Sequence, residues 1–441
     1  MQAELLDVMG SVYRNLGLYE RAVDLLATST RLREQTGGET ARLAASLDAL
    51  GEAQRLKGDY AVAEELLRRA VELNATLEGA NSLPTARTMT ALGRVLLARG
   101  SYEEAESTLR RSLDIHRAAP GRQPEVLADT LDALAGLALA QGDFDESRAM
   151  FEESLAIRRQ LFSEDNAIVA ASLNNLATAL GRSGDQQGAE ALQREALQIY
   201  TVAFGEEHPN VATAGNNLAL TLFLSGRYNE AEPLFRDSLA MRRRLLDEDH
   251  ADIAQSASNL GLLLQTVGRH QEAATFYQEA LTIRRAAFGD KHLLVAQTLN
   301  NLGLLEQTMG NHAAAEARLR EGLATMRELF GDDHPLVATN LSNLASVLYD
   351  RGGLEESERL YRESLAVRRA ALPEGHLDTS YPLLGLARLL AASDDSERAA
   401  EAEPLPTEGL QIRRASLPAG HALIIEAEEV LAAARANGGS R

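Results

Sequence analysis

Nine glycines recur at nearly constant spacing along this 441-residue chain. Eight of them are spaced 42 residues apart, and the first precedes the second by 41. A fixed period of this size is typical of chains in which one supersecondary unit repeats and stacks on its neighbours. The spacing therefore predicts one modular array in place of several separate globular domains. The glycines are Gly17, Gly58, Gly100, Gly142, Gly184, Gly226, Gly268, Gly310 and Gly352.

Two further positions keep the same period. Eight residues before each glycine lies an apolar residue, which is Leu in every unit except the first, where it is Met9. Five residues after each glycine lies a small one, as if two helices crossed closely there. The small residues are Ala22, Ala63, Ala105, Ser147, Ala189, Ala231, Ala273, Ala315 and Ser357.

Residues 209–250 show what one unit can form. Pro209 can open a helix, because the amide that proline lacks would be unpaired in the first turn. Apolar residues then follow at helical spacing up to Gly226, which can adopt the left-handed conformation of a tight turn. A second amphipathic helix follows, with Ala231 at the predicted crossing. Each unit is predicted to be an antiparallel helix pair that buries its faces by stacking on neighbouring pairs.

These residues resemble the tetratricopeptide repeat. The spacing of Leu218, Ala219, Gly226, Tyr228, Ala231 and Phe235 fits its helix-turn-helix consensus, lengthened to 42 residues. The 42-residue period, the NNLA segment and the HP step are similar to the kinesin-light-chain type. The resemblance implies an all-α fold, a right-handed superhelical solenoid of about ten stacked antiparallel helix pairs with a C-terminal capping helix.

The predicted boundaries place the solenoid in residues 1–420, and a capping helix with a disordered tail in residues 421–441. The tenth unit departs from the pattern, because its turn ASDDSERAAEAEP lacks the glycine. The first helical pattern begins almost at residue 1, so we also consider that the chain is a fragment of a longer protein.

Composition excludes several classes of function. A formal net charge of −20 argues against sequence-independent nucleic-acid binding, which needs a basic face. Cysteine is absent, which excludes disulfides and thiolate chemistry. There is neither an apolar run long enough to span a membrane nor a signal-peptide pattern at the N-terminus. We therefore expect a cytoplasmic protein with no membrane or nucleic-acid partner.

No catalytic or cofactor motif is present, so we expect neither an enzyme nor a cofactor. Five histidines recur every 42 residues and a sixth follows after 45. Equivalent points on stacked helices lie about 8 to 10 Å apart, too far for three imidazoles to share a metal ion. We interpret each histidine as a cap of the helix that follows. They are His208, His250, His292, His334, His376 and His421.

Arginine pairs recur near the ends of predicted second helices. Cations there complement the negative end of the helix dipole. They could also pair with acidic turns of the next unit, and binding of an acidic ligand stays open as an alternative. The pairs are Arg158 and Arg159, Arg242 and Arg243, Arg284 and Arg285, Arg368 and Arg369, and Arg413 and Arg414.

Asparagine is a poor helix former, yet it recurs in the middle of five consecutive first helices, those of the fifth to ninth units. Residues three or four apart share one face of a helix, and this face also carries Thr, Gln and Leu. The first member of each Asn pair, twice replaced by serine, is interpreted as structural. The pairs are Asn174 and Asn175, Asn216 and Asn217, Ser258 and Asn259, Asn300 and Asn301, and Ser342 and Asn343.

In tetratricopeptide arrays the first helices line the concave groove, and groove asparagines hold the backbone of an extended peptide. The resemblance carries that role to Asn175, Asn217, Asn259, Asn301 and Asn343, with Thr213, Gln255, Gln297 and Thr339 on the same face. Side-chain amides can both donate to and accept from a peptide backbone. Equally, these asparagines could satisfy polar groups between adjacent units, and the two roles are compatible.

The sequence thus predicts a non-catalytic protein–protein interaction scaffold that binds an extended segment of another protein in its groove. Two alternatives stay open. The chain could be the regulatory or sensor region of a larger signalling protein, such as a bacterial Ser/Thr kinase, although no HRD or DFG motif is present. It could also be a self-associating structural module whose repeats pack end to end.

Overall fold

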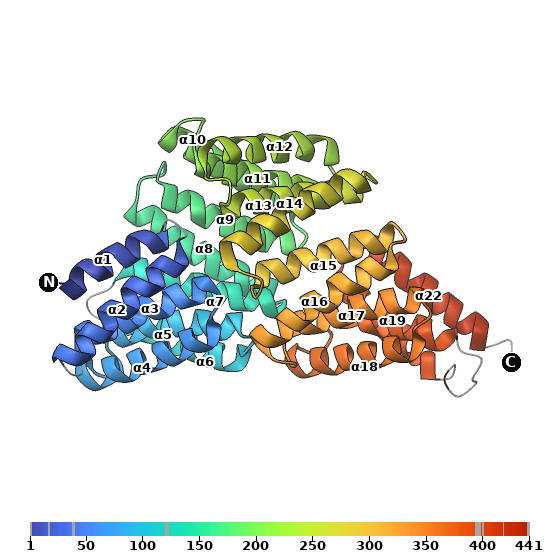
Figure 1. Cartoon of the computed structure of the whole chain (residues 1–441), viewed down its shortest axis with the longest axis horizontal. Helices are drawn as coiled ribbons and strands as arrows, with labels where there is room; N and C mark the ends of the chain where they lie inside the picture. Colours follow the sequence, from blue (N-terminus) through green and yellow to red (C-terminus); the bar gives the residue numbers. More distant parts are fainter. Residues whose placement is uncertain are drawn as a thin grey trace. The chain divides into compact units, whose positions relative to one another are not determined.

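The computed structural model describes residues 2–15, 18–37, 40–119, 123–392, 398, 401–417 and 419–438. By internal packing the chain divides into two compact units. The N-terminal unit comprises Met1–Ser183 and Gln187–Glu206, and the C-terminal unit comprises Gly184–Gln186 and Glu207–Arg441. In both, every regular element among the described residues is a helix, as Figure 1 shows. The expected all-α class is therefore confirmed.

In the N-terminal unit, first and second helices alternate along the chain. Each first helix from α3 to α9 packs against the second helix of the pair before it, so the pairs stack in sequence order. The helices are α1 Gln2–Asn15, α2 Tyr19–Gly37, α3 Ala41–Lys57, α4 Tyr60–Glu78, α5 Leu83–Ala98, α6 Tyr102–Ala118, α7 Pro124–Gln141, α8 Phe144–Leu161, α9 Ala167–Arg182 and α10 Gln186–Phe204.

The C-terminal unit repeats this arrangement and ends in α22, which packs on α19 and α21. Between α19 and α21, residues 393–397 and 399–400, where the irregular tenth turn is predicted, lie outside the described residues, as do residues 439–441 of the predicted tail. The helices are α11 Pro209–Leu224, α12 Tyr228–Leu245, α13 Ala251–Thr266, α14 His270–Phe288, α15 Leu293–Thr308, α16 His312–Phe330, α17 Pro335–Asp350, α18 Leu354–Ala371, the 3₁₀ turn Leu377–Thr379, α19 Ser380–Ala391, α21 Pro404–Ser416 and α22 Ala422–Gly438.

The periodic glycines end the first helices in the predicted way. The eight from Gly58 to Gly352 have φ between 74° and 98°, which is the left-handed region. Gly17 lies outside the described residues. The nine small residues that follow are all 0% exposed, as expected where two helices cross closely. These two positions therefore fix the helix-turn-helix geometry of the unit.

The periodic leucines form the core between the two helices of each pair. From Leu50 to Leu344 they are at most 6% exposed. Met9, their counterpart in α1, is 39% exposed, because no earlier described pair packs on that helix. Leu5, Val8 and Val12 on the same face are 51–61% exposed. None of the described helices combines the length and hydropathy of a membrane-spanning segment.

Candidate functional site

The polar face predicted from sequence lies on four neighbouring first helices of the C-terminal unit, α11, α13, α15 and α17, each of which contacts the next. We call it the first-helix face. All its side chains are half-buried or exposed, so a partner can reach them. It comprises an outer row (Thr213, Gln255, Gln297, Thr339), an asparagine row (Asn217, Asn259, Asn301, Asn343) and a third row (Leu220, Leu262, Leu304, Ser346).

The asparagine row alternates between engaged and unengaged amides. Asn259 donates through Nδ2 to Oδ1 of Asn216 at 3.2 Å, and Asn343 donates likewise to Asn300 at 2.7 Å. Within the C-terminal unit, the described residues show no hydrogen bond made by the side chains of Asn217 and Asn301. One of the two roles weighed from the sequence, contact between repeats, is thus present at Asn259 and Asn343, and peptide binding by the row stays a prediction.

The residue in the preceding repeat explains why Asn301 is unengaged. The position that holds Asn216 or Asn300 in other repeats is Ser258 here, and its shorter side chain ends in a buried hydroxyl that lacks a hydrogen-bond partner among the described residues. Asn216 is 3% exposed and accepts from Asn259, which agrees with the structural role predicted for the first member of each pair.

Three members of the outer row accept hydrogen bonds from arginines. Thr213 Oγ1 accepts from Nη2 of Arg242 at 2.8 Å, and Thr339 Oγ1 accepts from Arg368 at 3.1 Å. The Oε1 atom of Gln255 accepts from Arg284 at 3.2 Å, and its Nε2 donates to Asn259 at 3.1 Å. These side chains therefore join the first helix of a repeat to its own second helix.

Gln297, the fourth member of the outer row, differs because the corresponding position of α16 is Met326, which has no donor. The amide of Gln297 makes no hydrogen bond within the described residues and is half-buried. It therefore adds a third unengaged amide beside Asn217 and Asn301.

The first arginine of each pair differs from the sequence interpretation. It is buried between successive helix pairs, with 1–7% exposure at Arg158, Arg242, Arg284, Arg368 and Arg413. Nη1 of Arg242 donates to Oγ of Ser256 and to the backbone oxygen of Asp252, both at 2.7 Å. The guanidinium thus joins the first helix of its own pair to the first helix of the next. An acidic ligand has no access to it, which excludes that alternative for these five residues.

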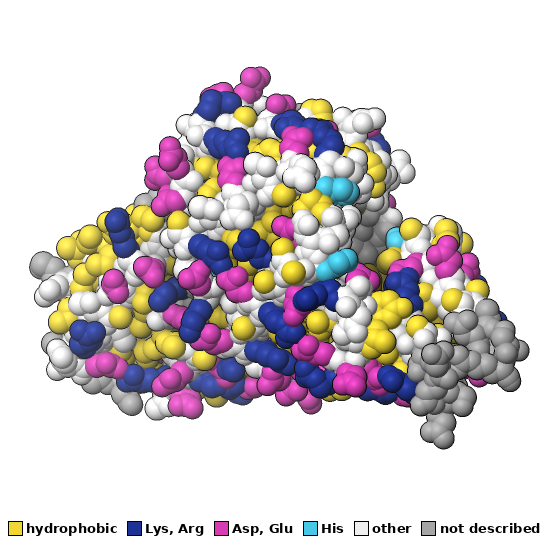
Figure 2. Space-filling model, turned by 45° about the vertical axis from the view of Figure 1, so that its right-hand side comes forward, with side chains coloured by type: hydrophobic (Ala, Val, Ile, Leu, Met, Phe, Trp, Pro, Cys, Tyr) yellow, Lys and Arg dark blue, Asp and Glu magenta, His cyan; other side chains and the backbone are white. Residues whose placement is uncertain are grey.

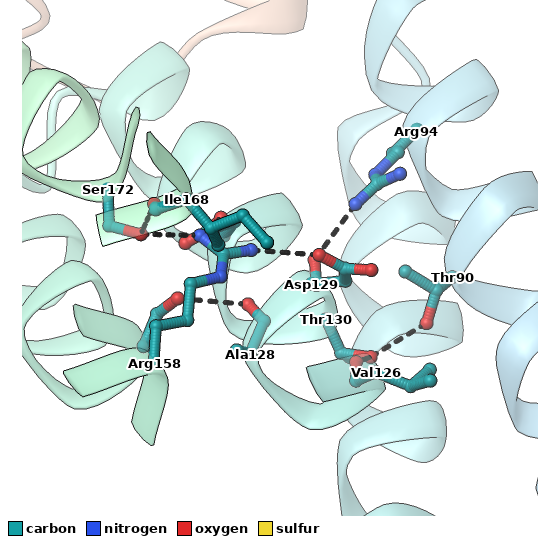
Figure 3. A network of polar contacts seen from close by, with 11 residues as sticks. Thr90, Arg94, Val126, Ala128, Asp129, Thr130, Arg158, Ile168 and Ser172 are labelled. Atoms are coloured by element: carbon teal, nitrogen blue, oxygen red, sulfur yellow. Dashed lines mark hydrogen bonds and ion pairs between the residues drawn. The ribbon is translucent and has the colours of Figure 1, made fainter. Parts of the chain in front are cut away.

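Arg158 makes the corresponding contacts in the N-terminal unit (Figure 3). It pairs with Asp129 at 2.8 Å and Asp132 at 2.7 Å in α7, and donates to Oγ of Ser172 in α9 at 2.7 Å. Its side chain is 8% exposed. A buried charge needs such partners to offset its desolvation.

Burial disfavours the charged form of the arginines in this series. It lowers the pKa of Arg284 to about 10, and it also lowers the pKa of Arg242 and of Arg368. The guanidinium of Arg284 nevertheless stays charged at neutral pH, since that pKa is well above 7. The Nε atoms of these three residues have no hydrogen-bond partner among the described residues, so their desolvation is only partly offset.

The second arginine of each pair is exposed except Arg285, which is half-buried, and from Arg159 to Arg369 it bridges successive second helices. Arg243 binds both carboxylate oxygens of Glu279, at 2.7 and 2.8 Å, and Arg159 pairs with Glu195 at 2.5 Å. Figure 2 shows the result on one side of the molecule, where basic and acidic side chains alternate. These arginines thus pair with acidic residues of the next unit, but Glu279 and Glu195 lie within its second helix and not in the acidic turns suggested by the sequence.

The histidine ladder caps helices as predicted. Nδ1 of His208 accepts a hydrogen bond from the backbone N–H of Asn210 at 3.1 Å. Each of the other five histidines likewise accepts through Nδ1 from the backbone N–H of the residue two positions later. This satisfies one of the amides left unpaired in a first turn. Among the residues that the structure describes, no group of three or more His, Cys, Asp or Glu side chains could hold a metal ion.

Asn175, the remaining predicted site residue, lies on α9 in the N-terminal unit and is exposed. Sequence reasoning missed the buried arginine network. The signal was present, because the residue fourteen positions after Arg158, Arg242 and Arg284 is in each case Ser or Thr. Reading the first and second arginines as one motif hid their different environments.

Comparison with known protein families gives one match that covers most of the chain. The model of the tetratricopeptide repeat matches residues 2–76, 55–118, 126–201, 187–244, 210–286, 252–328, 294–370 and 336–403. No curated protein sequence matches the chain.

Solved structures are similar to the chain at low sequence identity. A Rap protein complexed with Competence and Sporulation Factor has 13% identity and a TM-score of 0.53, with 90% of this chain and 99% of that one covered. BtubC (BKLC) from P. vanneervenii has 25% identity and a TM-score of 0.41, covering 54% and 92%. A putative kinesin light chain of Podosopora anserina has 21% identity and a TM-score of 0.41, covering 46% and 97%.

Proposed function

Because this chain belongs to the tetratricopeptide repeat family, we propose that it is a non-catalytic scaffold whose C-terminal unit binds an extended segment of another protein along the first-helix face. The observation that carries this proposal is the pair of unengaged amides, Asn217 and Asn301, in a row whose other members are tied to neighbouring repeats. An asparagine amide offers two donors and an acceptor, which matches the backbone of an extended chain.

Because asparagines with and without contacts to other repeats alternate, substitutions in the two groups can separate peptide binding from stability. Removing the Asn259 amide takes away contacts to Asn216 and Gln255, and removing the Asn343 amide takes away the contact to Asn300. Each lost neutral hydrogen bond costs about 0.5–1.5 kcal/mol. Removing the Asn217 and Asn301 amides takes away no such contact, and alanine is the better helix former.

The test is selection of random 12-residue peptides displayed on phage against the intact chain. We expect enriched peptides to bind the parent protein and to lose at least about tenfold in affinity on N217A/N301A, since two hydrogen bonds are removed. Thermal unfolding of this variant should match that of the parent.

The matched variant is N259A/N343A, which should unfold at lower temperature. Enriched peptides that bind the parent and N217A/N301A equally would refute the proposed site, and failure to enrich any peptide would refute peptide binding itself. Pull-down with mass spectrometry from the native organism would then identify the partner.

A further inference from the structure

The first helices that form the first-helix face carry almost no charge. Each of α11, α13, α15 and α17 has 16 residues, and together their charged residues are Asp252, Glu306 and Asp350. None is basic. In contrast, α3 in the N-terminal unit carries Arg42, Asp48, Glu52, Arg55 and Lys57. Low charge is therefore shared by these four helices, and α9 and α19 carry one charged residue each, whereas α3 carries five.

The three acidic residues stand near helix ends and are engaged. Asp252 is in the first turn of α13, 3.9 Å from Arg242. Glu306 accepts from Nδ2 of Asn311 at 2.7 Å, and Asp350, the last residue of α17, accepts from Gln307 at 2.6 Å. The middle turns of all four helices, which carry the asparagine row, have no ionised side chain to pair with a charged partner.

A line of exposed and half-buried apolar side chains runs beside the asparagine row. Leu262 is 36% exposed and Leu224 is 56% exposed, while Leu220 and Leu304 are half-buried. Covering such side chains stabilises a complex by about 25 cal/mol per Å² of apolar surface removed from water. Burying a charged partner group here without a counterion would cost free energy instead.

The spacing of the helices restricts the conformation of the partner. Packed helices lie about 8–10 Å apart. A polyproline II segment rises about 3.1 Å per residue with three residues per turn, so every third side chain projects to one side at intervals of about 9 Å. Its backbone has no internal hydrogen bonds and is free to bind the amides of Asn217 and Asn301.

We propose that the partner is an uncharged extended segment in the polyproline II conformation, with an apolar side chain at every third position facing Leu220, Leu262 and Leu304. This inference rests on the proposed function and adds the chemistry of the ligand. The asparagine row binds the backbone, and the leucines select the side chains.

The experiment uses synthetic 12-residue peptides derived from those selected on the intact chain. We expect enriched sequences to be depleted of Asp, Glu, Lys and Arg and to carry apolar residues at every third position. Their affinity should change less than about twofold between low and high salt, since screening acts on charged pairs. A peptide with Lys in place of one apolar residue should bind with an affinity at least about tenfold lower.

Leucine variants test which side chains contact the selected peptides. The variant L220A/L262A/L304A should bind these peptides with an affinity at least about tenfold lower. The control variant L354A shortens a leucine that is 46% exposed on the second helix α18, and it should leave the affinity unchanged. L262K should shift selection toward acidic peptides. Circular dichroism and thermal unfolding of each variant report whether the fold is intact.

Two results would overturn the inference while leaving the proposed function standing. One is selection of charged peptides whose affinity depends on salt but whose binding is still abolished by N217A/N301A. The other is unchanged affinity for L220A/L262A/L304A with intact folding. If no selected peptide depends on Asn217 and Asn301, the proposed function itself fails.

Discussion

Arg242 donates to Oγ of Ser256 at 2.7 Å from a position that is 2% exposed, and so joins two successive helix pairs through a buried charge. The Nη2 atom of Arg242 donates a hydrogen bond to Oγ1 of Thr213. The same position in α16 is Met326, 1% exposed, so the stack accommodates either a cation with polar partners or an apolar side chain of similar length.

The first prediction concerns this network. Ser256→Ala should lower the free energy of unfolding by about 1.5–3 kcal/mol, because it removes a hydrogen bond to a buried charge. The double change R242M/S256A should alter it by less than about 1.5 kcal/mol, since apolar residues then replace both the buried cation and its buried partner. Denaturant unfolding measures both variants. A larger loss for R242M/S256A than for Ser256→Ala would contradict this expectation.

His116 provides a second prediction, on pH. It occupies in α6 the position of the buried arginines, is 2% exposed, and neither ring nitrogen has a hydrogen-bond partner within the described residues. Burial lowers its pKa below the usual 6.5. The unfolded state therefore binds a proton more readily, so this contribution to stability is complete above about pH 6.5 and is lost as pH falls below that value.

His116→Met should reduce the acid sensitivity of the N-terminal unit, because methionine does not titrate. The measurement is denaturant unfolding of the parent and the variant between about pH 5 and 8. The six capping histidines lie in the C-terminal unit and are unchanged in both proteins. Identical pH profiles for the two proteins would show that His116 is protonated equally well in both states.

A third prediction tests the pairs between second helices. Arg243 and Glu279 are about half and a third exposed, so their coupling should be only about 0.2–1 kcal/mol in a double-mutant cycle. The coupling should diminish in about 1 M salt, where the Debye length is about 3 Å. A coupling larger than that of Arg242 with Ser256 would show that the exposed pairs, and not the buried arginines, contribute more to the contact between repeats.

The exposed face of α1 gives a fourth prediction. Leu5, Val8 and Val12 are each more than half exposed, whereas the outward side of α22 carries Glu428 and Glu429. An apolar stripe of this kind favours association. We expect light scattering to show an average mass that rises with concentration, and V8E/V12E to abolish the rise. Val62→Glu, at a single exposed valine of α4, should leave it unchanged, and a parent protein that stays monomeric would contradict the prediction.

Periodicity made the repeat unit predictable. Gly226 and Ala231 recur because the turn requires a left-handed residue and the crossing requires a small one, and both requirements act within a few residues of sequence. The capping role of His208 was predictable for the same reason, since its Nδ1 binds a backbone amide only two residues away.

The sequence predicted which helix face carries the candidate site, but not the hydrogen bonds of its individual side chains. Asn217, Asn259, Asn301 and Asn343 look equivalent in sequence, yet their hydrogen bonds differ because the partner side chain belongs to another repeat. Whether residue 258 is Asn or Ser decides what Asn301 can reach, and a single helix contains no information on that contact.

The sequence by itself determined the helix pair, its turn, its caps and its repetition, because these depend on interactions between residues close along the chain. Tertiary structure decided which arginine of each pair is buried and which amides of the asparagine row stay open. Those outcomes depend on how one pair stacks on the next, where Arg242 and Ser256 meet across the interface and Asn301 meets no acceptor. Burial and hydrogen bonding are properties of that stacked interface and not of the repeat alone.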